Sequence, residues 1–145
     1  MSREISRRFG AAGLGMVFLW AAMTKLFDVN AFIDTIGSYG LVWEPLLGPA
    51  AWGLIVVELI VGAALLAGQR WAPRVASVLV LVFLAVLGYG IGLGLDIECG
   101  CFGSGEGGGL SLWQAVGVDC GLLVVCCWLQ RSKTDIVKTG EELEQ

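Results

Sequence analysis

Four apolar stretches, each close to the length of a membrane-spanning helix, dominate this sequence and cover roughly residues 9–27, 46–68, 75–95 and 110–128. A helix needs ~20 apolar residues to cross ~30 Å of hydrocarbon. Backbone polar groups in lipid must be paired within a helix or a closed barrel. Because the stretches lack the alternating pattern of barrel strands, they predict four transmembrane helices.

The composition agrees with a protein that lies in a lipid bilayer. Of 145 residues, 57% are hydrophobic and only 15% are charged, and the mean hydropathy is +0.80. These values lie outside the range of ordinary soluble domains. We expect one all-α domain, a four-helix transmembrane bundle over residues 1–132, followed by a polar cytoplasmic tail over residues 133–145. No nucleic-acid-binding surface is indicated.

The distribution of charge predicts the orientation. Basic residues occupy one set of segments between and beside the spans: Arg3, Arg7, Arg8, Arg70, Arg74, Arg131, Lys133 and Lys138. The two remaining loops are mostly acidic, with Asp28, Asp34, Glu44, Asp96, Glu98 and Glu106. Short loops rich in Lys and Arg stay in the cytoplasm. We therefore expect both termini in the cytoplasm and the acidic loops on the periplasmic or extracellular side of a bacterial inner (cell) membrane.

Several features predict how the helices pack. Between the first two spans, Phe32, Ile33, Ile36 and Tyr39 share one helical face, which indicates a short amphipathic segment at the outer interface. Trp20 and Trp52 lie deep in their spans, so we expect them to pack inside the protein. The third helix has two small-xxx-small pairs, which permit close contact within the bundle or in a homodimer: Gly88 with Gly92, and Gly90 with Gly94.

The most informative polar segment contains Cys99, Gly100 and Cys101 between the third and fourth spans. Thiols oxidise on the outer side of a cell membrane, and the two Cα atoms of an i, i+2 pair can come within disulfide distance. Such a ring is strained, and strain makes a disulfide easier to reduce. Cys99 and Cys101 are thus a candidate redox pair. Two alternatives stay open: a disulfide that only pins the loop, and a soft-metal site of two thiolates.

Other unusual side chains lie within the spans. Cys120, Cys126 and Cys127 lie on the last helix, where free cysteine usually packs as a small apolar residue, and their role stays open. Two acids, Glu58 and Asp119, lie mid-helix, at depths of about 18 Å and about 14 Å from the outer ends.

Intramembrane acids are candidates for function. Glu58 and Asp119 therefore indicate either proton handling, for instance beside a bound quinone, or a hydrogen-bonded packing role. Lys25, near the outer end of the first helix, is a third candidate for this intramembrane polar site. We expect it to be too shallow to reach Glu58 unless the helices are staggered, and to extend towards the interface instead.

Three motifs are arranged as in a known family: Lys25-Leu26-Phe27-Asp28 with Phe32, Ile36 and Tyr39; Glu58 with Gly62, Leu65, Leu66 and Gly68; and Cys99-Gly100-Cys101-Phe102-Gly103. With these motifs the chain resembles the DoxX-like membrane proteins, specifically their methylamine-utilisation MauE branch. The resemblance implies a four-helix membrane protein of thiol-disulfide chemistry that assists maturation of a periplasmic enzyme alongside a thioredoxin-like partner. It marks Cys99 and Cys101 as the redox pair and Glu58 as an intramembrane acid.

Our leading hypothesis is therefore a membrane thiol-disulfide oxidoreductase or redox conduit that uses Cys99 and Cys101. Its expected partner is a thioredoxin-like or disulfide-bearing periplasmic protein. The alternative hypothesis is a transporter or binding protein for a soft metal ion or another thiophilic solute, with the same cysteines as receptor. A third is an accessory subunit that only scaffolds a larger membrane complex.

Overall fold

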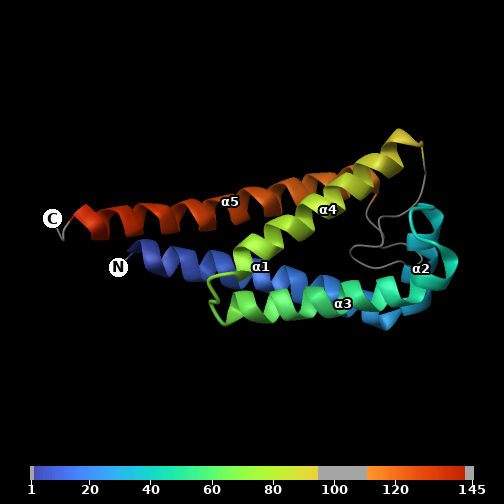
Figure 1. The fold of residues 1–145 in the computed structure, drawn as a ribbon, viewed down its shortest axis with the longest axis horizontal. Coiled ribbons are helices and arrows are strands. Elements are labelled where there is room, and N and C mark those ends of the chain that lie inside the picture. The colour runs from blue at the N-terminus through green and yellow to red at the C-terminus, as the bar shows by residue number, and fades with distance from the viewer. Residues whose placement is uncertain (1, 95–110, 143–145) are drawn as a thin grey trace.

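The computed structural model describes the backbone of residues 2–94 and 111–142, and the side chains of residues 5–94 and 111–131. These residues form five helices (Figure 1): α1 (Ser2–Phe27), α2 (Val29–Ser38), α3 (Glu44–Leu66), α4 (Ala72–Gly92) and α5 (Leu112–Glu142). Four of them, all except α2, are long and apolar enough to cross a membrane. The predicted all-α bundle of four membrane helices is confirmed, and the protein is a multi-pass membrane protein.

Two helices extend well beyond their apolar stretches. α1 begins at Ser2 rather than near residue 9, and α5 continues to Glu142 rather than ending near residue 128. Polar residues such as Arg, Lys and Glu are good helix formers, so a helix does not end where its apolar stretch ends. The segment 133–145, predicted as a polar tail, is thus largely a continuation of α5.

Local signals fix the other helix ends. Asp28 caps α2, because its side chain accepts a hydrogen bond of 3.0 Å from the Ala31 N–H. A proline lies in the first turn of both α3 and α4, where its missing N–H costs nothing. Gly68 and Gly94, at φ +70° and +67°, follow α3 and α4 in the left-handed conformation that glycine adopts without strain.

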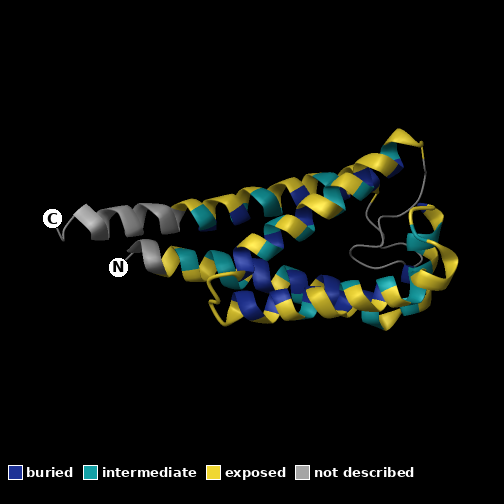
Figure 2. Cartoon of the chain, in the orientation of Figure 1, coloured by how far each residue is buried: buried dark blue, intermediate teal, exposed yellow. Residues whose placement is uncertain are grey.

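The helices form two main pairs, α1 with α3 and α4 with α5. Both termini lie at one end of the molecule, together with the α3–α4 connection, and α2 lies at the other end (Figure 1). Buried residues face inward between the helices, whereas the outward faces are exposed (Figure 2). The largest core cluster takes side chains from all four long helices, among them Phe18, Leu65, Val80 and Leu129.

Close contact between α1 and α3 depends on two glycines. A Cβ atom on Gly15 would lie 2.9 Å from the carbonyl oxygen of Gly62, and one on Gly62 would lie 3.1 Å from the carbonyl oxygen of Gly15. Neither distance leaves room for a side chain, so the two backbones touch directly, as small residues allow in membranes. This contact was not predicted, because the two glycines lie on different helices and form no spaced pair.

The glycines of the third span, α4, do not make the close helix–helix contacts predicted for them. Gly90 accommodates the ring of Tyr39, the residue that follows α2, since a Cβ there would lie 2.7 Å from Tyr39 Cε1. Gly88, Gly92 and Gly94 have nothing within 4 Å of a Cβ. The expected close helix contact is therefore absent within the described chain, and a homodimer stays a prediction.

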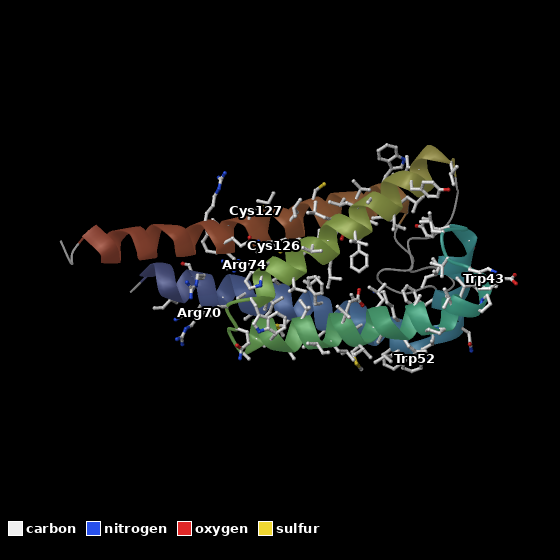
Figure 3. The ribbon with its side chains drawn as sticks, viewed as in Figure 1. Trp43, Trp52, Arg70, Arg74, Cys126 and Cys127 are labelled. Carbon is white, nitrogen blue, oxygen red and sulfur yellow. The ribbon has the colours of Figure 1, made fainter. Side chains whose placement is uncertain are left out.

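The prediction that Trp20 and Trp52 pack inside the protein is wrong. Their side chains are 67% and 51% exposed, and Trp52 points away from the bundle (Figure 3). In lipid the outward face of a helix is apolar as well, so both rings lie on the outward surface without exposure to water. The cysteines of α5 differ in the same way: Cys126 is buried as expected, whereas Cys120 and Cys127 are exposed.

Alanine substitutions at two glycines of α1 should have opposite effects. Gly15→Ala should lower the free energy of unfolding by roughly 1–3 kcal/mol, because its methyl group forces α1 and α3 apart. Gly13→Ala should raise it by up to about 1 kcal/mol, because Gly13 has open space and alanine favours helix. Unfolding in mixed micelles measures both. Equal effects of the two variants would contradict direct contact at Gly15.

Candidate functional site

A buried ion pair joins α1 and α3. Lys25 Nζ lies 3.1 Å from Glu58 Oε1, and the two side chains are 2% and 1% exposed. Lys25 Nζ also donates a hydrogen bond of 3.2 Å to the Ala21 carbonyl oxygen. Burying two charges is costly, and the cost is recovered only when each charge has a well-placed partner.

The expectation that Lys25 is too shallow and extends to the interface is therefore wrong. Lys25 lies two residues before the end of α1, yet it meets Glu58, which lies 14 residues after Glu44 at the start of α3. At ~1.5 Å per residue the start of α3 extends well beyond the end of α1. α1 and α3 are therefore staggered along their axes, and a stagger of this kind is what the sequence analysis required for Lys25 to reach Glu58.

The amphipathic helix α2 closes this end of the site. Phe32 is 5% exposed and packs with Ala51 and Ile55 of α3. Its ring centroid lies 5.4 Å from Lys25 Nζ, within range of a cation–π interaction. Because α2 covers the ammonium group, Lys25 is shielded from the interface and directed towards Glu58.

Asp119 of α5 completes the site. Its side chain is 4% exposed, and it attracts Lys25 electrostatically. Two carboxylate oxygens, Glu58 Oε2 and Asp119 Oδ2, are buried without a hydrogen-bond partner among the described residues. Lys25, Glu58 and Asp119 line one cavity of about 20 Å³, together with six residues of apolar surface: Val17, Phe18, Ala21, Val80, Phe83 and Leu122. The two acids singled out in the sequence are thus brought together.

The size of this cavity limits what it can hold. An engineered cavity that binds benzene has a volume of about 150 Å³, so a cavity of about 20 Å³ has no room for a quinone ring. The expected quinone beside Glu58 and Asp119 does not fit this arrangement of helices. Among residues 5–94 and 111–131, no group of three or more His, Cys, Asp or Glu side chains could hold a metal ion.

Tyr39 is a second buried polar side chain near the α2 end. It is 6% exposed and packs with Leu87, Leu112 and Ala115. Burial raises the pKa of the Tyr39 phenol, so the hydroxyl stays neutral. The sequence indicated Tyr39 only as part of an apolar face, because its contact with Gly90 depends on where the residue that follows α2 meets α4.

A larger cavity of about 590 Å³ lies at the end of the molecule that holds the termini. Arg7 and Arg8 of α1 and Gln69 after α3 line it beside apolar side chains such as Leu65 and Leu129. The basic residues were used in the sequence only to predict orientation. A cavity lined from four separate parts of the chain leaves no local pattern, so the sequence did not indicate it.

The fold and the site define a class: a multi-pass membrane protein with a buried Lys–Glu–Asp cluster among four spanning helices. Comparison of the sequence assigns the family, since residues 4–130 match methylamine utilisation protein MauE. The chain belongs to the MauE family. No curated protein and no solved structure matches it significantly. The wider likeness to DoxX-like proteins stays a prediction, and Cys99 and Cys101 lie outside the described residues.

Removing one member of the ion pair should lower the free energy of unfolding more than removing both members. Lys25→Met leaves Glu58 buried without its cation, which should lower the free energy of unfolding by about 3 kcal/mol. Lys25→Met/Glu58→Met replaces the pair with apolar side chains and should recover most of that loss. A double-mutant cycle in mixed micelles measures the coupling. A double variant no more stable than Lys25→Met would contradict a buried, mutually dependent pair.

Proposed function

We propose that this MauE-family protein is a membrane thiol-disulfide oxidoreductase or redox conduit in which Cys99 and Cys101 cycle between dithiol and disulfide. The main support is the position of the cysteine segment in the chain. Residues 95–110 connect α4 to α5, and α4 and α5 approach that connection at the α2 end, away from the termini (Figure 1). The described chain on either side of the cysteine segment therefore lies at the end that α2 covers.

The proposal places this end on the periplasmic side of a bacterial inner membrane. Arg70 and Arg74 lie towards the end that holds both termini (Figure 3), and Arg7 and Arg8 line the cavity there. Basic residues next to spanning helices favour the cytoplasmic side. The α2 end then faces the oxidising compartment, where a disulfide persists.

The proposed chemistry is thiol-disulfide exchange. A thiolate of a periplasmic protein attacks one sulfur of the Cys99–Cys101 disulfide, which forms a mixed disulfide and releases the other cysteine as a thiolate. The second thiol of the periplasmic protein then attacks the mixed disulfide. That protein gains a disulfide, and Cys99 and Cys101 take up two electrons and become a dithiol.

A thioredoxin-like protein in its disulfide form reoxidises the pair by the same two steps. The direction of net flow depends on the reduction potentials of the partners. Assistance in the maturation of a periplasmic protein corresponds to the oxidising direction. The soft-metal alternative uses the same two thiolates, and no contact among the described residues favours it.

The redox state of the pair tests the proposal directly. In membranes equilibrated across a series of glutathione redox potentials, alkylation should add two fewer labels to the protein when Cys99 and Cys101 are oxidised. The change in labelling should follow one reversible two-electron transition. Cys99→Ser and Cys101→Ser should each abolish the transition. Cys120→Ser and Cys127→Ser are matched controls on the exposed surface of α5 and should leave it unchanged.

Other outcomes of this experiment contradict the proposal. Thiols that remain reduced throughout and are protected only by an added soft metal would favour the metal-binding alternative. Cysteine variants without any effect on partner proteins would favour a scaffold. If the redox transition is present, Cys99→Ser or Cys101→Ser should trap a mixed disulfide with the periplasmic partner.

The orientation can be tested separately with a membrane-impermeant maleimide. In intact cells whose outer membrane is permeabilised, reduced Cys99 and Cys101 should react, and a cysteine introduced by Lys133→Cys should react only after the inner membrane is opened. A Cys120→Ala/Cys127→Ala background removes the exposed cysteines, and Cys126 is 0% exposed. Labelling of Lys133→Cys in intact cells would reverse the proposed orientation.

A further inference from the structure

We propose that Lys25, Glu58 and Asp119 form a proton-binding site in the membrane, in which Glu58 and Asp119 share one proton through a single bound water molecule. The site involves none of the cysteines, so the inference stands apart from the thiol-disulfide proposal. Its basis is the charge, the unpaired atoms and the volume of one cavity.

Charge is the first argument. The cavity brings together one basic and two acidic side chains, Lys25, Glu58 and Asp119. The remaining lining from α4 and α5, Val80, Phe83 and Leu122, is apolar. Lys25 compensates one carboxylate, and a second bare carboxylate in hydrocarbon is so costly that the group is neutralised instead. One additional proton makes the cluster neutral.

The unpaired oxygens are the second argument. Glu58 uses Oε1 for Lys25, while Glu58 Oε2 and Asp119 Oδ2 are buried and have no partner among the described residues. The Thr24 hydroxyl, next to Lys25 in the sequence, donates to the Ala21 carbonyl oxygen. The Tyr39 hydroxyl is also buried without a partner among the described residues, but Tyr39 does not line this cavity. Buried polar atoms are almost always hydrogen-bonded, to protein or to ordered water.

Volume is the third argument. A bound water needs about 10–15 Å³ and at least two polar partners. The cavity of about 20 Å³ provides the volume for one water and no more. The two unpaired carboxylate oxygens provide the partners. A water between them donates to one oxygen and accepts from the protonated carboxyl group, which satisfies both.

The position of the site indicates what such a proton can do. The cluster spans three helices, α1, α3 and α5, and its charge balance depends on the Lys25–Glu58 contact. If α1 moves against α3, Lys25 and Glu58 separate. The two carboxyl groups then need two protons instead of one to be neutral. Proton uptake and helix movement are therefore linked at this site.

Infrared spectroscopy of the full chain in lipid at neutral pH tests the proposal. The carbonyl stretch of a protonated carboxylic acid should be present, and heavy-oxygen water should shift the band of one internal water. Asp119→Asn and Glu58→Gln should each abolish the carboxylic acid band, because one carboxylate then balances Lys25 without a proton. The exposed acid Asp34 gives a matched control, and Asp34→Asn should change nothing.

Removal of the cation gives the decisive result. In Lys25→Met two carboxylates remain without a basic partner, so both should bind protons and the band should grow about twofold. A purely structural ion pair beside an ionised Asp119 predicts no band in the wild type and a new band in Lys25→Met, so it is the wild-type band together with its twofold growth that separates the two cases. The proposal is overturned if the wild-type band is absent, if Asp119→Asn and Glu58→Gln both retain it, or if Lys25→Met leaves it unchanged. None of these results depends on the redox state of Cys99 and Cys101.

Discussion

The contact between Lys25 and Glu58 determines much of this structure. Two charges in an apolar bundle must meet, and their side chains reach one another only if α3 begins well beyond the end of α1. This stagger leaves α2 to cover the end of α1, and Phe32 fills the space above the ammonium group. The glycine contact at Gly15 and Gly62 holds the two backbones together further along the same helix pair. Electrostatics and close packing thus fix a single register between α1 and α3.

The spans could be predicted from the sequence because hydrocarbon thickness sets a minimum length of apolar chain. The ends of α1 and α5 could not be predicted in this way. Both helices continue past their apolar stretches, to Ser2 and to Glu142, through polar sequence that also favours helix. Trp20 and Trp52 show a second limit. In water a large aromatic residue in the middle of a helix is usually buried, but in lipid the outward face is apolar as well, so hydrophobicity no longer distinguishes inside from outside.

The candidate site was predictable to a similar extent. Glu58 and Asp119 stand out because an acid in an apolar run is rare, and the structure brings them to one cavity. The contact of Lys25 was missed because depth along one helix says nothing about the stagger between two. Tyr39 was missed as a buried polar group because its place against Gly90 of α4 is a contact between residues far apart in the sequence. The proposed roles of Cys99 and Cys101 rest on the sequence, the family resemblance and the order of the helices.

The length of α5 has a consequence beyond the bilayer. Its 31 residues form a rod of about 46 Å at ~1.5 Å per residue, whereas the hydrocarbon layer is ~30 Å thick. About 16 Å of backbone helix therefore extends past the lipid tails on the side of the termini. A protein fused to the C-terminus would be carried clear of the headgroups on a continuous helix. Because α5 is continuous, rotation of its end beyond the lipid would also rotate Asp119, which lies in the same cavity as the Lys25–Glu58 ion pair.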